Sequence, residues 1–598
     1  MSVEAKDKNA NLRRNSLRLS VVVKFLAVLT LFLFFFISFL QVPLNNYDFW
    51  WHLATGKYIV ENKSLPQSDP FSYTTKDTPS DRKSIILKGY WLSQVIFYKV
   101  FSLWDVKGII ILRSLLMLLF LFFVFLNTRK QTSSDLISLI FVAIVFLVAV
   151  PYSADRPQLF TFMIFALIFY LLEDFRTNKS KKVFLIPLFM ILLSNMHPGY
   201  IVCLLLVSLY LFAYVFHYFV KKDEDTGSFK TIMILWILTV LSSALNPTGL
   251  SEFKEMFSIG KHTEGITEFM PTFYLFAKKL TPVSYPYIFF LIFPVLILWD
   301  FKKINLFHII LLIVFAVMSF ISIRYVIFYM CIAAPILARI TINLGEKKIF
   351  AKLIRVLKTR NDFLYVVSCI IGIFLIFYSL PSLARYELKT DTSSGIPRGA
   401  ADFLTKLKIN GNMFNEYGFG GYLIWRLYPD KKVFIDGRLL EPDVYNEYQI
   451  VTSTKKGQSQ SWADIIKKYD ISCFIMSSLS YHGQIYPIVE KLFDSDEWVL
   501  IYCDPLSLIF LNQKPENVLV IKGHAIDKKE MLNAIISQAL AGAKSDRVNP
   551  YYLISLGKVL LKMGKFDDAE NAFLAAYERD HTNLEVKYWL QKIRERHK

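Results

Sequence analysis

Residues 21–56 have the sequence VVVKFLAVLTLFLFFFISFLQVPLNNYDFWWHLATG, and this stretch decides the fold class. Its first part, Val21–Leu40, is almost wholly apolar and is long enough to cross roughly 30 Å of hydrocarbon as a helix. A basic leader, residues 1–20, precedes it, and no small-residue cleavage site follows. We therefore expect an uncleaved signal-anchor helix that leads into a loop on the far side of a membrane.

Similar apolar runs recur along the first two thirds of the chain. The 598 residues are 54% hydrophobic and 16% aromatic, with a mean hydropathy of +0.39, which is too apolar for soluble domains. We predict a polytopic α-helical membrane protein with about eleven transmembrane helices inside residues 21–383. The predicted spans are 21–41, 107–127, 134–151, 158–174, 183–195, 199–220, 229–245, 284–300, 304–321, 325–342 and 363–383.

Lysine and arginine residues in the short loops indicate the orientation. They gather at 129–130, 176–182, 221–222, 302–303 and 347–360, on alternate sides of successive spans. This pattern places the N-terminus in the cytoplasm, and it places the loops 42–106 and 246–282 and everything after Leu383 on the periplasmic or extracellular side of the cytoplasmic (inner) membrane. The net charge of +19 is then an orientation signal and a contact with membrane lipids, not the mark of a nucleic-acid-binding protein.

Outside the spans, two further regions have soluble character. The segment YWLSQVIFYKVFSLW, residues 90–104, has a helical apolar period that suits an interfacial helix. Residues 391–513 alternate short helices and strands, which predicts a small external α/β domain. The predicted strands are 412–415, 432–438, 472–477, 498–503 and 507–512.

The last part, residues 524–598, is predicted to be a helical tail with one tetratricopeptide (TPR) repeat. Small and apolar residues at the spacing of that repeat allow two antiparallel helices to pack closely, and the groove between them suits a protein partner. The matching residues are Leu553, Leu556, Gly557, Leu560, Gly564, Ala569, Phe573 and Ala576.

Six motifs together carry a resemblance to a known group. They are DFWWHLATGKYIV (48–60), LPQSDPFSYT (65–74), RPQLFTF (156–162), SNMHPGY (194–200), ALNPTGL (244–250) and GFGGYLIWRLYPDKKVFIDGR (418–438). The chain resembles a group of bacterial integral-membrane proteins that is similar to the GT-C superfamily of glycosyltransferases, which use polyprenyl-phosphate-linked sugars. The resemblance covers residues 20–440, and a tetratricopeptide tail is a frequent companion.

The resemblance implies that an aspartate in the first external loop, here Asp48, deprotonates the acceptor. A carboxylate beside Trp50 and Trp51 at the membrane surface is partly desolvated, which raises its pKa and makes it a better base. His52 would lie on the same helical face and orient Asp48 or contact the donor phosphate. The alternative is that DFWWH is an interfacial anchor in which Asp48 caps the following helix.

A donor that carries a lipid phosphate also requires cations at the external face of the membrane to bind that phosphate. Arg156, in the short turn after the third span, and Arg324, between the ninth and tenth, are candidates because guanidinium groups match phosphate oxygens. The alternative is that these arginines extend toward the membrane surface or pair with Asp155. Arg113, inside the second span, is expected to face the bundle interior and is a further candidate for binding the donor phosphate. His197 lies where Pro198 and Gly199 break the helix, and it is either a donor-binding residue or a structural histidine.

Weaker candidates lie in the remaining loops. Asp436 and Arg438 follow a predicted strand, where they form either an external-domain site or a turn with an internal ion pair. The GFGGY segment resembles a phosphate loop only superficially. His262, Glu264 and Glu268 could supply ligands for a divalent metal, but no ligand spacing supports a metal site or any other cofactor.

Two hypotheses of different classes follow. In the first, the protein transfers a sugar from a polyprenyl-phosphate carrier to an envelope acceptor at the outer face of the cytoplasmic membrane. In the second, it is a non-catalytic membrane scaffold whose tail recruits envelope-assembly partners. The second fits Gly89–Tyr90, which stand where related sequences often have His-Glu. A transporter is disfavoured because the sequence shows no inverted repeat and few charges within the spans.

Overall fold

A computed structural model describes residues 3–44, 46–220, 226–249, 251, 270–277, 285–292, 306–344, 361–385, 395–407, 409–455 and 460–596. The chain forms two compact units. The first comprises Met1–Asn46, Thr55–Leu65 and Ser80–Thr392, and the second comprises Tyr47–Ala54, Pro66–Pro79 and Ser393–Lys598. Helix α2 (Tyr47–Asn62) contributes residues to both units.

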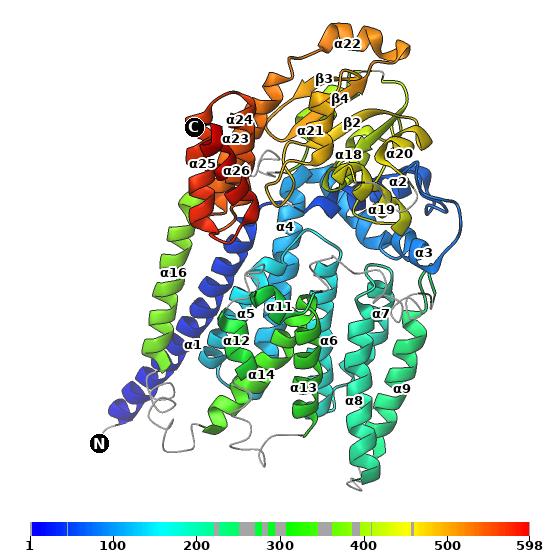
Figure 1. Ribbon diagram of the computed structural model, residues 1–598. Coiled ribbons are helices and arrows are strands. Elements are labelled where there is room, and N and C mark those ends of the chain that lie inside the picture. The colour runs from blue at the N-terminus through cyan, green and yellow to red at the C-terminus, as the bar shows by residue number, and fades with distance from the viewer. Residues whose placement is uncertain are drawn as a thin grey trace. The chain divides into compact units, whose positions relative to one another are not determined.

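The first unit is a bundle of helices (Figure 1). Within the described residues, its longer helices are α1 (Val3–Leu40), α4 (Trp91–Thr132), α5 (Asp135–Ala149), α6 (Gln158–Asn178), α8 (Tyr200–Val220), α9 (Thr226–Ser243), α13 (Leu306–Ile321), α14 (Val326–Leu344) and α16 (Asn361–Arg385). Shorter helices are α3 (Asp81–Lys88), η1 (Val150–Tyr152), η2 (Lys181–Leu185), α7 (Ile186–Ser194), α11 (Thr272–Ala277), α12 (Tyr285–Ile292) and η7 (Ile323–Tyr325).

Each of the predicted spans contains a helix, and the structure supports a multi-pass membrane protein. In the described part of the chain, six helical segments are long and apolar enough to cross a bilayer: Val21–Leu40, Asp81–Thr132, Asp135–Tyr152, Gln158–Asn178, Ile323–Asn343 and Phe363–Pro381. Three apolar helices are shorter: Tyr200–Phe216, Gly227–Ser243 and Phe307–Ile321. The total of eleven spans stays a prediction, and the candidate metal ligands His262, Glu264 and Glu268 lie outside the described residues.

The predicted interfacial segment forms the start of α4, and this helix is broken just after the segment, at Asp105. Asp105 has φ 53° and ψ −151°, so residues before and after it form two helices that meet at a kink. Leu103 and Trp104, just before the break, are 69% and 65% exposed. The break gives the segment before it a different direction from the spanning helix that follows.

Hydrogen bonds and ion pairs between polar side chains connect helices α4, α6 and α8 of the bundle. Glu173 of α6 is 1% exposed and accepts hydrogen bonds from Arg176, from Gln131 of α4 and from the Tyr210 hydroxyl of α8 (2.6 Å). Lys130 of α4 pairs with Asp174. Because buried charges are tolerated only when paired, this network fixes the register of three helices. Elsewhere α1 and α16 pack side by side, as do α8 and α9 (Figure 1).

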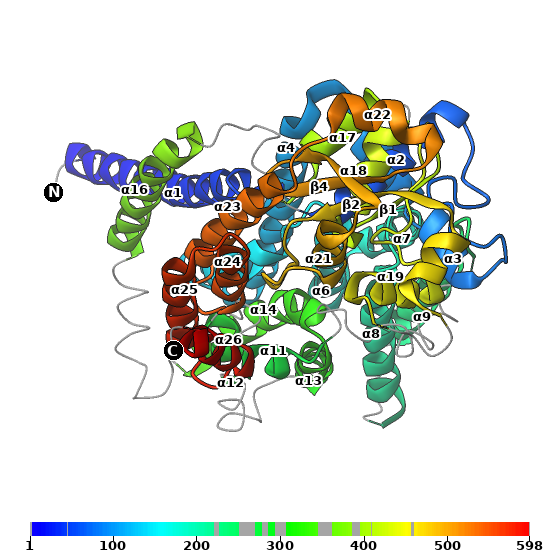
Figure 2. The same ribbon diagram turned by 45° about the horizontal axis from the view of Figure 1, so that its top comes forward.

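A mixed four-stranded sheet organises the second unit. Its strands are β1 (Asn412–Asn415), β2 (Ile471–Ser477), β3 (Trp498–Cys503) and β4 (Ser507–Asn512), in the order β1-β2-β4-β3. β1 and β2 are parallel, and the other two pairs are antiparallel. Its flanking helices are α17 (Arg398–Thr405), η9 (Tyr417–Phe419), α18 (Gly420–Leu427), α19 (Pro442–Ser453), α20 (Trp462–Lys468) and α21 (Pro487–Asp494). Helices α17, α19, α20 and α21 all contact the strands, and Figure 2 shows α17, α19 and α21 beside the sheet.

The strand predicted over residues 432–438 is wrong. Val433 forms only an isolated bridge with Ser72, although Phe434 and Ile435 are buried as a strand would be. The Asn415 side chain takes the place of a neighbouring strand, because it accepts from the Phe434 amide (2.8 Å) and donates to the Ile435 carbonyl (2.8 Å). The apolar run therefore satisfies its backbone without joining the sheet.

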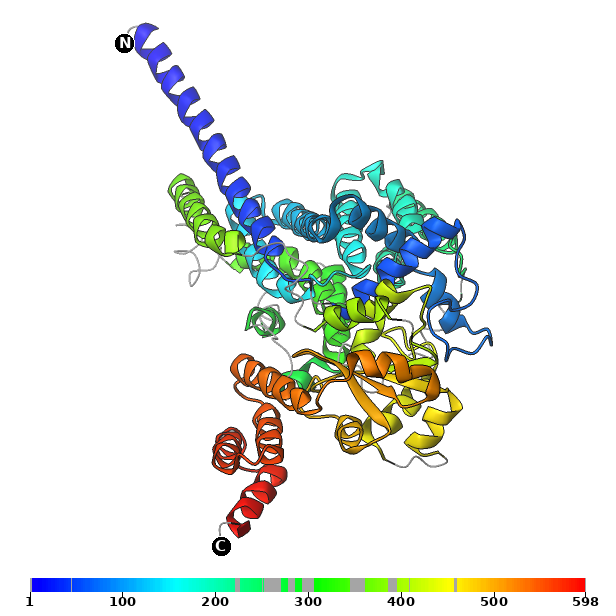
Figure 3. The same ribbon diagram turned by 90° about the horizontal axis from the view of Figure 1, so that it is seen from above.

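Helices follow the sheet to the end of the described chain. They are η10 (Pro515–Asn517), α22 (Val518–His524), α23 (Lys529–Ser545), α24 (Tyr551–Lys562), α25 (Phe566–Arg579) and α26 (Leu584–Arg596). α23 to α26 pack successively, as Figure 3 shows. A Cβ on Gly557 of α24 would lie 2.6 Å from the Phe573 ring of α25, so this glycine allows the two helices to approach closely. The assignment of a TPR repeat stays a prediction.

Candidate functional site

Three of the residues predicted to bind the donor gather in the first unit. We call Arg156, His197 and Arg324 the basic cluster. Arg156 lies in the turn between η1 and α6, and its Nε donates to Asn46 Oδ1 (3.0 Å). Arg324 lies in η7, and the Tyr152 hydroxyl of η1 donates to the carbonyl of the preceding residue, Ile323 (2.9 Å). This bond ties the two arginine-bearing turns together.

His197 is held in a defined orientation beside these arginines. Its Nδ1 accepts from the Gly199 amide (2.9 Å) and lies 2.8 Å from Thr161 Oγ1. Burial, together with the charges of Arg324 and Arg156, lowers the pKa of His197 to about 3. Because a backbone amide can only donate, Nδ1 is the acceptor, and the neutral ring carries its proton on Nε2. His197 is therefore a neutral hydrogen-bond donor next to two cations.

The loop that carries His197 is fixed by the start of α4. The Trp91 indole donates to Asn195 Oδ1 (2.8 Å), and the Ser93 hydroxyl donates to the Met196 carbonyl (2.9 Å). Tyr90 contacts the His197 ring edge-to-face, with ring centroids 5.7 Å apart. The motif SNMHPGY thus gains its position from long-range contacts that its own sequence does not reveal.

Arg113 lies in the bundle interior, as predicted, but its contacts are those of a structural residue. Its side chain is 1% exposed and pairs with Asp155, also 1% exposed, at 2.9 Å. It also donates to the carbonyls of Phe39 and Val42 at the end of α1. Arg113 therefore links the segment that leads to Asn46 with the turn that holds Arg156, which favours a positioning role over direct phosphate contact.

Asp48 lies in the second unit, at the start of α2. It is half-buried and accepts a hydrogen bond from the Trp51 indole (3.2 Å). His52 is 3% exposed, and its ring lies against that of Trp51 with centroids 3.5 Å apart. Asp48 occupies the first turn of the helix, where a carboxylate also interacts favourably with the helix dipole, so the base and capping interpretations both remain consistent with this geometry.

In the second unit, glycines allow the segments DFWWH, GFGGY and DGR to lie close together. A Cβ on Gly437 would overlap Asp48 Oδ1, and one on Gly421 would lie 2.6 Å from the Tyr47 carbonyl. A Cβ on Gly420 would overlap the Ile435 carbonyl. Gly421 and Gly437 are therefore needed for the close approach of the DFWW segment, and Gly420 is needed for the close approach of GFGGY to the residue before DGR.

Asp436 and Arg438 form a buried ion cluster with residues of the SDPFSYT motif. Arg438 Nε and Nη2 donate to Asp436 (2.7 Å each), and Nη1 donates to Asp69 Oδ1 (2.6 Å). Ser72 bridges the Arg438 guanidinium and Asp436. The Arg438 and Asp69 side chains are 1% exposed, so the geometry is that of an internal ion pair that fixes a turn.

Glu416 is a further acidic residue near Asp48 that the sequence patterns did not single out. Its carboxylate accepts from the Phe419 amide (3.0 Å) and from the Tyr486 hydroxyl (3.4 Å). Burial raises the pKa of Glu416 to about 7. Tyr417 lies close enough to Asp48, Asp436 and Glu416 that their charges, after burial, raise the pKa of its hydroxyl.

Other supporting residues were also missed by the sequence patterns. Asn46, Thr161, Asp69 and Ser72 all contact a predicted residue, and the available signal was that three of them fall in or beside quoted motifs. In the described ranges, no group of three or more His, Cys, Asp or Glu side chains is arranged to hold a metal ion.

Comparison with known proteins shows the fold. No protein-family model matches the chain, and no curated protein matches its sequence. Among solved structures, the oligosaccharyltransferase AglB from Archaeoglobus fulgidus, in complex with an inhibitory peptide and a dolichol-phosphate, is similar with a TM-score of 0.52 at 10% identity, over 94% of this chain and 87% of that chain.

A second structure of the Archaeoglobus fulgidus oligosaccharyltransferase, tethered to an acceptor peptide with an NVT sequon, gives a TM-score of 0.50 at 11% identity. That match covers 82% of this chain and 74% of the other. Such low identity establishes similarity of fold and not of activity. The chain is thus similar in fold to an archaeal oligosaccharyltransferase, and it combines several helices that are apolar and long enough to cross a membrane with a C-terminal domain that contains a sheet.

Proposed function

We propose that this protein is a membrane glycosyltransferase that moves a sugar from a polyprenyl-phosphate-linked donor to an acceptor of the cell envelope, at the outer face of the cytoplasmic membrane. The observation that carries the proposal is the basic cluster. The positive charges of Arg156 and Arg324 lower the pKa of His197, so two guanidinium groups lie close to one neutral histidine. The fold of the chain is similar to that of AglB, whose structure was solved with a dolichol-phosphate.

The basic cluster has the chemistry needed to bind a phosphate. Arginine presents planar pairs of N–H donors that match phosphate oxygens, and His197 adds an Nε2–H donor. A bound phosphate dianion or monoanion is stabilised by the two positive charges, and so is the extra negative charge that develops on it as the sugar leaves. Arg113 and Asp155 would keep the Arg156 turn in place.

Asp48 is the proposed base. It would take the proton from the acceptor hydroxyl or amine while the acceptor attacks the sugar carbon and the bond to the lipid phosphate breaks. The Trp51 indole holds one carboxylate oxygen. Asp48 follows Asn46 by two positions in the chain. Asn46 in turn accepts from Arg156.

The decisive experiment separates donor binding from transfer. Radiolabelled polyprenyl phosphate is titrated onto the full chain in nanodiscs, and sugar release from a polyprenyl-phosphate-linked sugar is measured in parallel. We expect Arg156→Gln and Arg324→Gln to weaken lipid binding roughly 10- to 100-fold, the value of one or two charged hydrogen bonds. Asp48→Asn should retain lipid binding and lose roughly 10²- to 10⁴-fold in rate.

Arg339→Gln is the matched control, because Arg339 lies on α14 of the same unit and bonds to Gln131 instead of joining the basic cluster. It should bind polyprenyl phosphate as the unmodified chain does. Absence of saturable polyprenyl-phosphate binding by the folded protein, or equal losses in the control, would rule out the basic cluster as a donor site.

One observation favours the second candidate function, a non-catalytic scaffold. Tyr90 packs on His197 at the position where related sequences often carry an acidic residue. If the protein is a scaffold, Asp48→Asn and Arg324→Gln should be tolerated in a complementation assay, whereas removal of residues 524–598 should abolish function. An enzyme would show the opposite pattern for the purified protein.

A further inference from the structure

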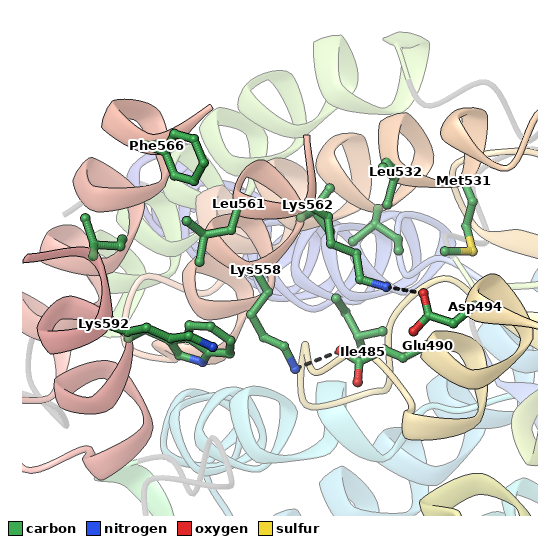
Figure 4. A pocket seen from close by; sticks show the side chains of 14 residues that line it. Ile485, Glu490, Asp494, Met531, Leu532, Lys558, Leu561, Lys562, Phe566 and Lys592 are labelled. Carbon is green, nitrogen blue, oxygen red and sulfur yellow. Dashed lines mark hydrogen bonds and ion pairs between the residues drawn. The ribbon is translucent and has the colours of Figure 1, made fainter. Parts of the chain in front are cut away.

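The second unit contains a pocket that the proposed transfer reaction does not use. It lies among α21, α23, α24 and α26 and has a volume of about 460 Å³, within the range of ligand and side-chain binding pockets (Figure 4). We propose that this pocket binds an extended segment of a partner protein, which places one large apolar side chain in the pocket and an acidic side chain at its rim.

The floor of the pocket is hydrocarbon. Ile535 of α23 and Val559 of α24 are 1% and 2% exposed, and Trp589 of α26 forms one wall. The Trp589 ring stacks on Phe573 with centroids 5.9 Å apart and an interplanar angle of 5°. Such a surface gains free energy when an apolar side chain replaces water on it, at roughly 25 cal/mol for each Å² removed from water.

The walls are held together before any partner arrives. The Ser555 hydroxyl of α24 donates to the Gly483 carbonyl (2.7 Å), and the Asn549 side chain donates to the His482 carbonyl (3.0 Å). These bonds link the start of α24 with the loop before α21. A pocket with fixed walls binds with a smaller loss of conformational entropy than one that must form on binding.

The rim carries charges of both signs with an excess of lysine. Lys558 pairs with Glu490 at 2.9 Å and Lys562 pairs with Asp494 at 3.0 Å, as Figure 4 shows. Lys592 has aromatic partners instead: its Nζ lies 5.0 Å from the Trp589 ring centroid and 5.8 Å from that of Tyr588. Among the residues that the structure describes, no carboxylate pairs with Lys592. One ammonium group therefore stands at the rim, next to the aromatic wall, with its charge uncompensated.

Charge complementarity selects the occupant. A peptide with an acidic residue beside its apolar anchor pairs with Lys592 while the anchor fills the pocket, and an acidic side chain is the partner that an uncompensated ammonium group selects. An anionic lipid surface fits less well, because a flat surface has no single side chain to fill a pocket of about 460 Å³. A small polar ligand would need convergent polar groups in the floor, where the described lining is apolar.

The test uses the full chain in nanodiscs and a displayed library of random peptides. Selection should enrich peptides that carry a large apolar residue near Asp or Glu, with Leu561→Glu, at the pocket wall, used for counter-selection. Lys592→Glu should weaken an enriched acidic peptide up to about fivefold, the value of an exposed ion pair. It should correspondingly strengthen the same peptide with Lys in place of its acid.

Lys587→Glu is the matched control, because Lys587 is an exposed lysine on the same helix that does not line the pocket. Enriched peptides that respond equally to both lysine variants, or that bind Leu561→Glu unchanged, would overturn the proposal. Saturable binding of vesicles with anionic lipid through Lys592, with no peptide enriched, would overturn it in favour of a membrane contact. Each result is independent of polyprenyl-phosphate binding, since none of these residues belongs to the basic cluster.

Discussion

Arg438 of the second unit differs in its surroundings from Arg156 and Arg324 of the first unit. In the second unit, Arg438 is enclosed by Asp69 and Asp436, which accept from all three of its guanidinium nitrogens. In the first unit, the positive charges of Arg156 and Arg324 help to lower the pKa of His197. The first arrangement neutralises the cation within the protein, and in the second the two cations act on the same histidine. An arginine in a short polar motif is therefore evidence for a site only when its carboxylate neighbours are known.

The largest expected effect tests whether Arg438 is structural. Arg438→Gln leaves Asp69 and Asp436 buried without their cation, which should lower the free energy of unfolding by about 3 to 5 kcal/mol. Thermal unfolding of the full chain in detergent, followed by tryptophan fluorescence, measures the loss. Arg426→Gln is the control, because Arg426 pairs with Asp402 at the surface and should cost at most about 1 kcal/mol. Equal melting temperatures for the two variants would contradict the internal ion pair.

The next prediction concerns the buried pair in the first unit. Arg113→Gln should destabilise the protein by about 3 kcal/mol, because it strands the Asp155 carboxylate. It should also weaken polyprenyl-phosphate binding while Arg156 and Arg324 remain intact. Adding Asp155→Asn should recover part of the stability, since both buried groups are then uncharged. If Arg113→Gln impaired lipid binding and Arg113→Gln with Asp155→Asn restored neither property, Arg113 would be a direct ligand.

Smaller effects are expected where glycines allow the motifs to meet. Gly437→Ala and Gly421→Ala each force a methyl group against Asp48 or the Tyr47 carbonyl, which should cost about 1 to 3 kcal/mol as an overpacking strain. Gly437→Ala should in addition slow transfer, because it displaces the carboxylate proposed as the base. Gly523→Ala, where no atom lies within 4 Å of the added Cβ, serves as the neutral comparison in the same unfolding assay.

The smallest effect is a pH dependence. The pKa of Glu416 is raised from 4.5 to about 7, so between these values the folded chain keeps a proton that the unfolded chain has lost. Stability should therefore fall as the pH rises from about 5 to 7, with a slope below one proton. Glu416→Gln should flatten this slope, whereas Glu497→Gln, at an exposed position, should leave it unchanged. A slope that is identical in Glu416→Gln would assign the titration to another group.

Much of the architecture follows from local sequence. The spans are dictated by bilayer thickness, so length and apolarity suffice to locate a helix in each one, and the strands 412–415, 472–477, 498–503 and 507–512 follow from short apolar runs between turns. The strand prediction for 432–438 is wrong for a physical reason: the side chains of Asn415 and Thr74 and the backbone of residues 71–73 satisfy the polar groups that a neighbouring strand would otherwise satisfy.

The site is less predictable than the fold. Arg156, His197 and Arg324 could be nominated one by one from residue type and place, but their grouping depends on contacts between distant segments. The pair between Arg438 and Asp436 is local, but Asp69, the other partner of Arg438, and Asp155, the partner of Arg113, are 369 and 42 residues away in the chain, and no local pattern connects them. The same residue types would look identical in sequence whether they bind a ligand or each other.

The edges of the sheet limit how this protein can meet others. At the outer strand β1, the Tyr73 hydroxyl donates to the Met413 carbonyl (2.9 Å), and at the opposite outer strand β3, the Ile526 amide donates to the Leu500 carbonyl (2.8 Å). An incoming strand would need these same carbonyl groups to extend the sheet. The second unit is thereby protected against edge-to-edge polymerisation, and a partner that docks on it must recognise side chains instead of a free backbone ladder.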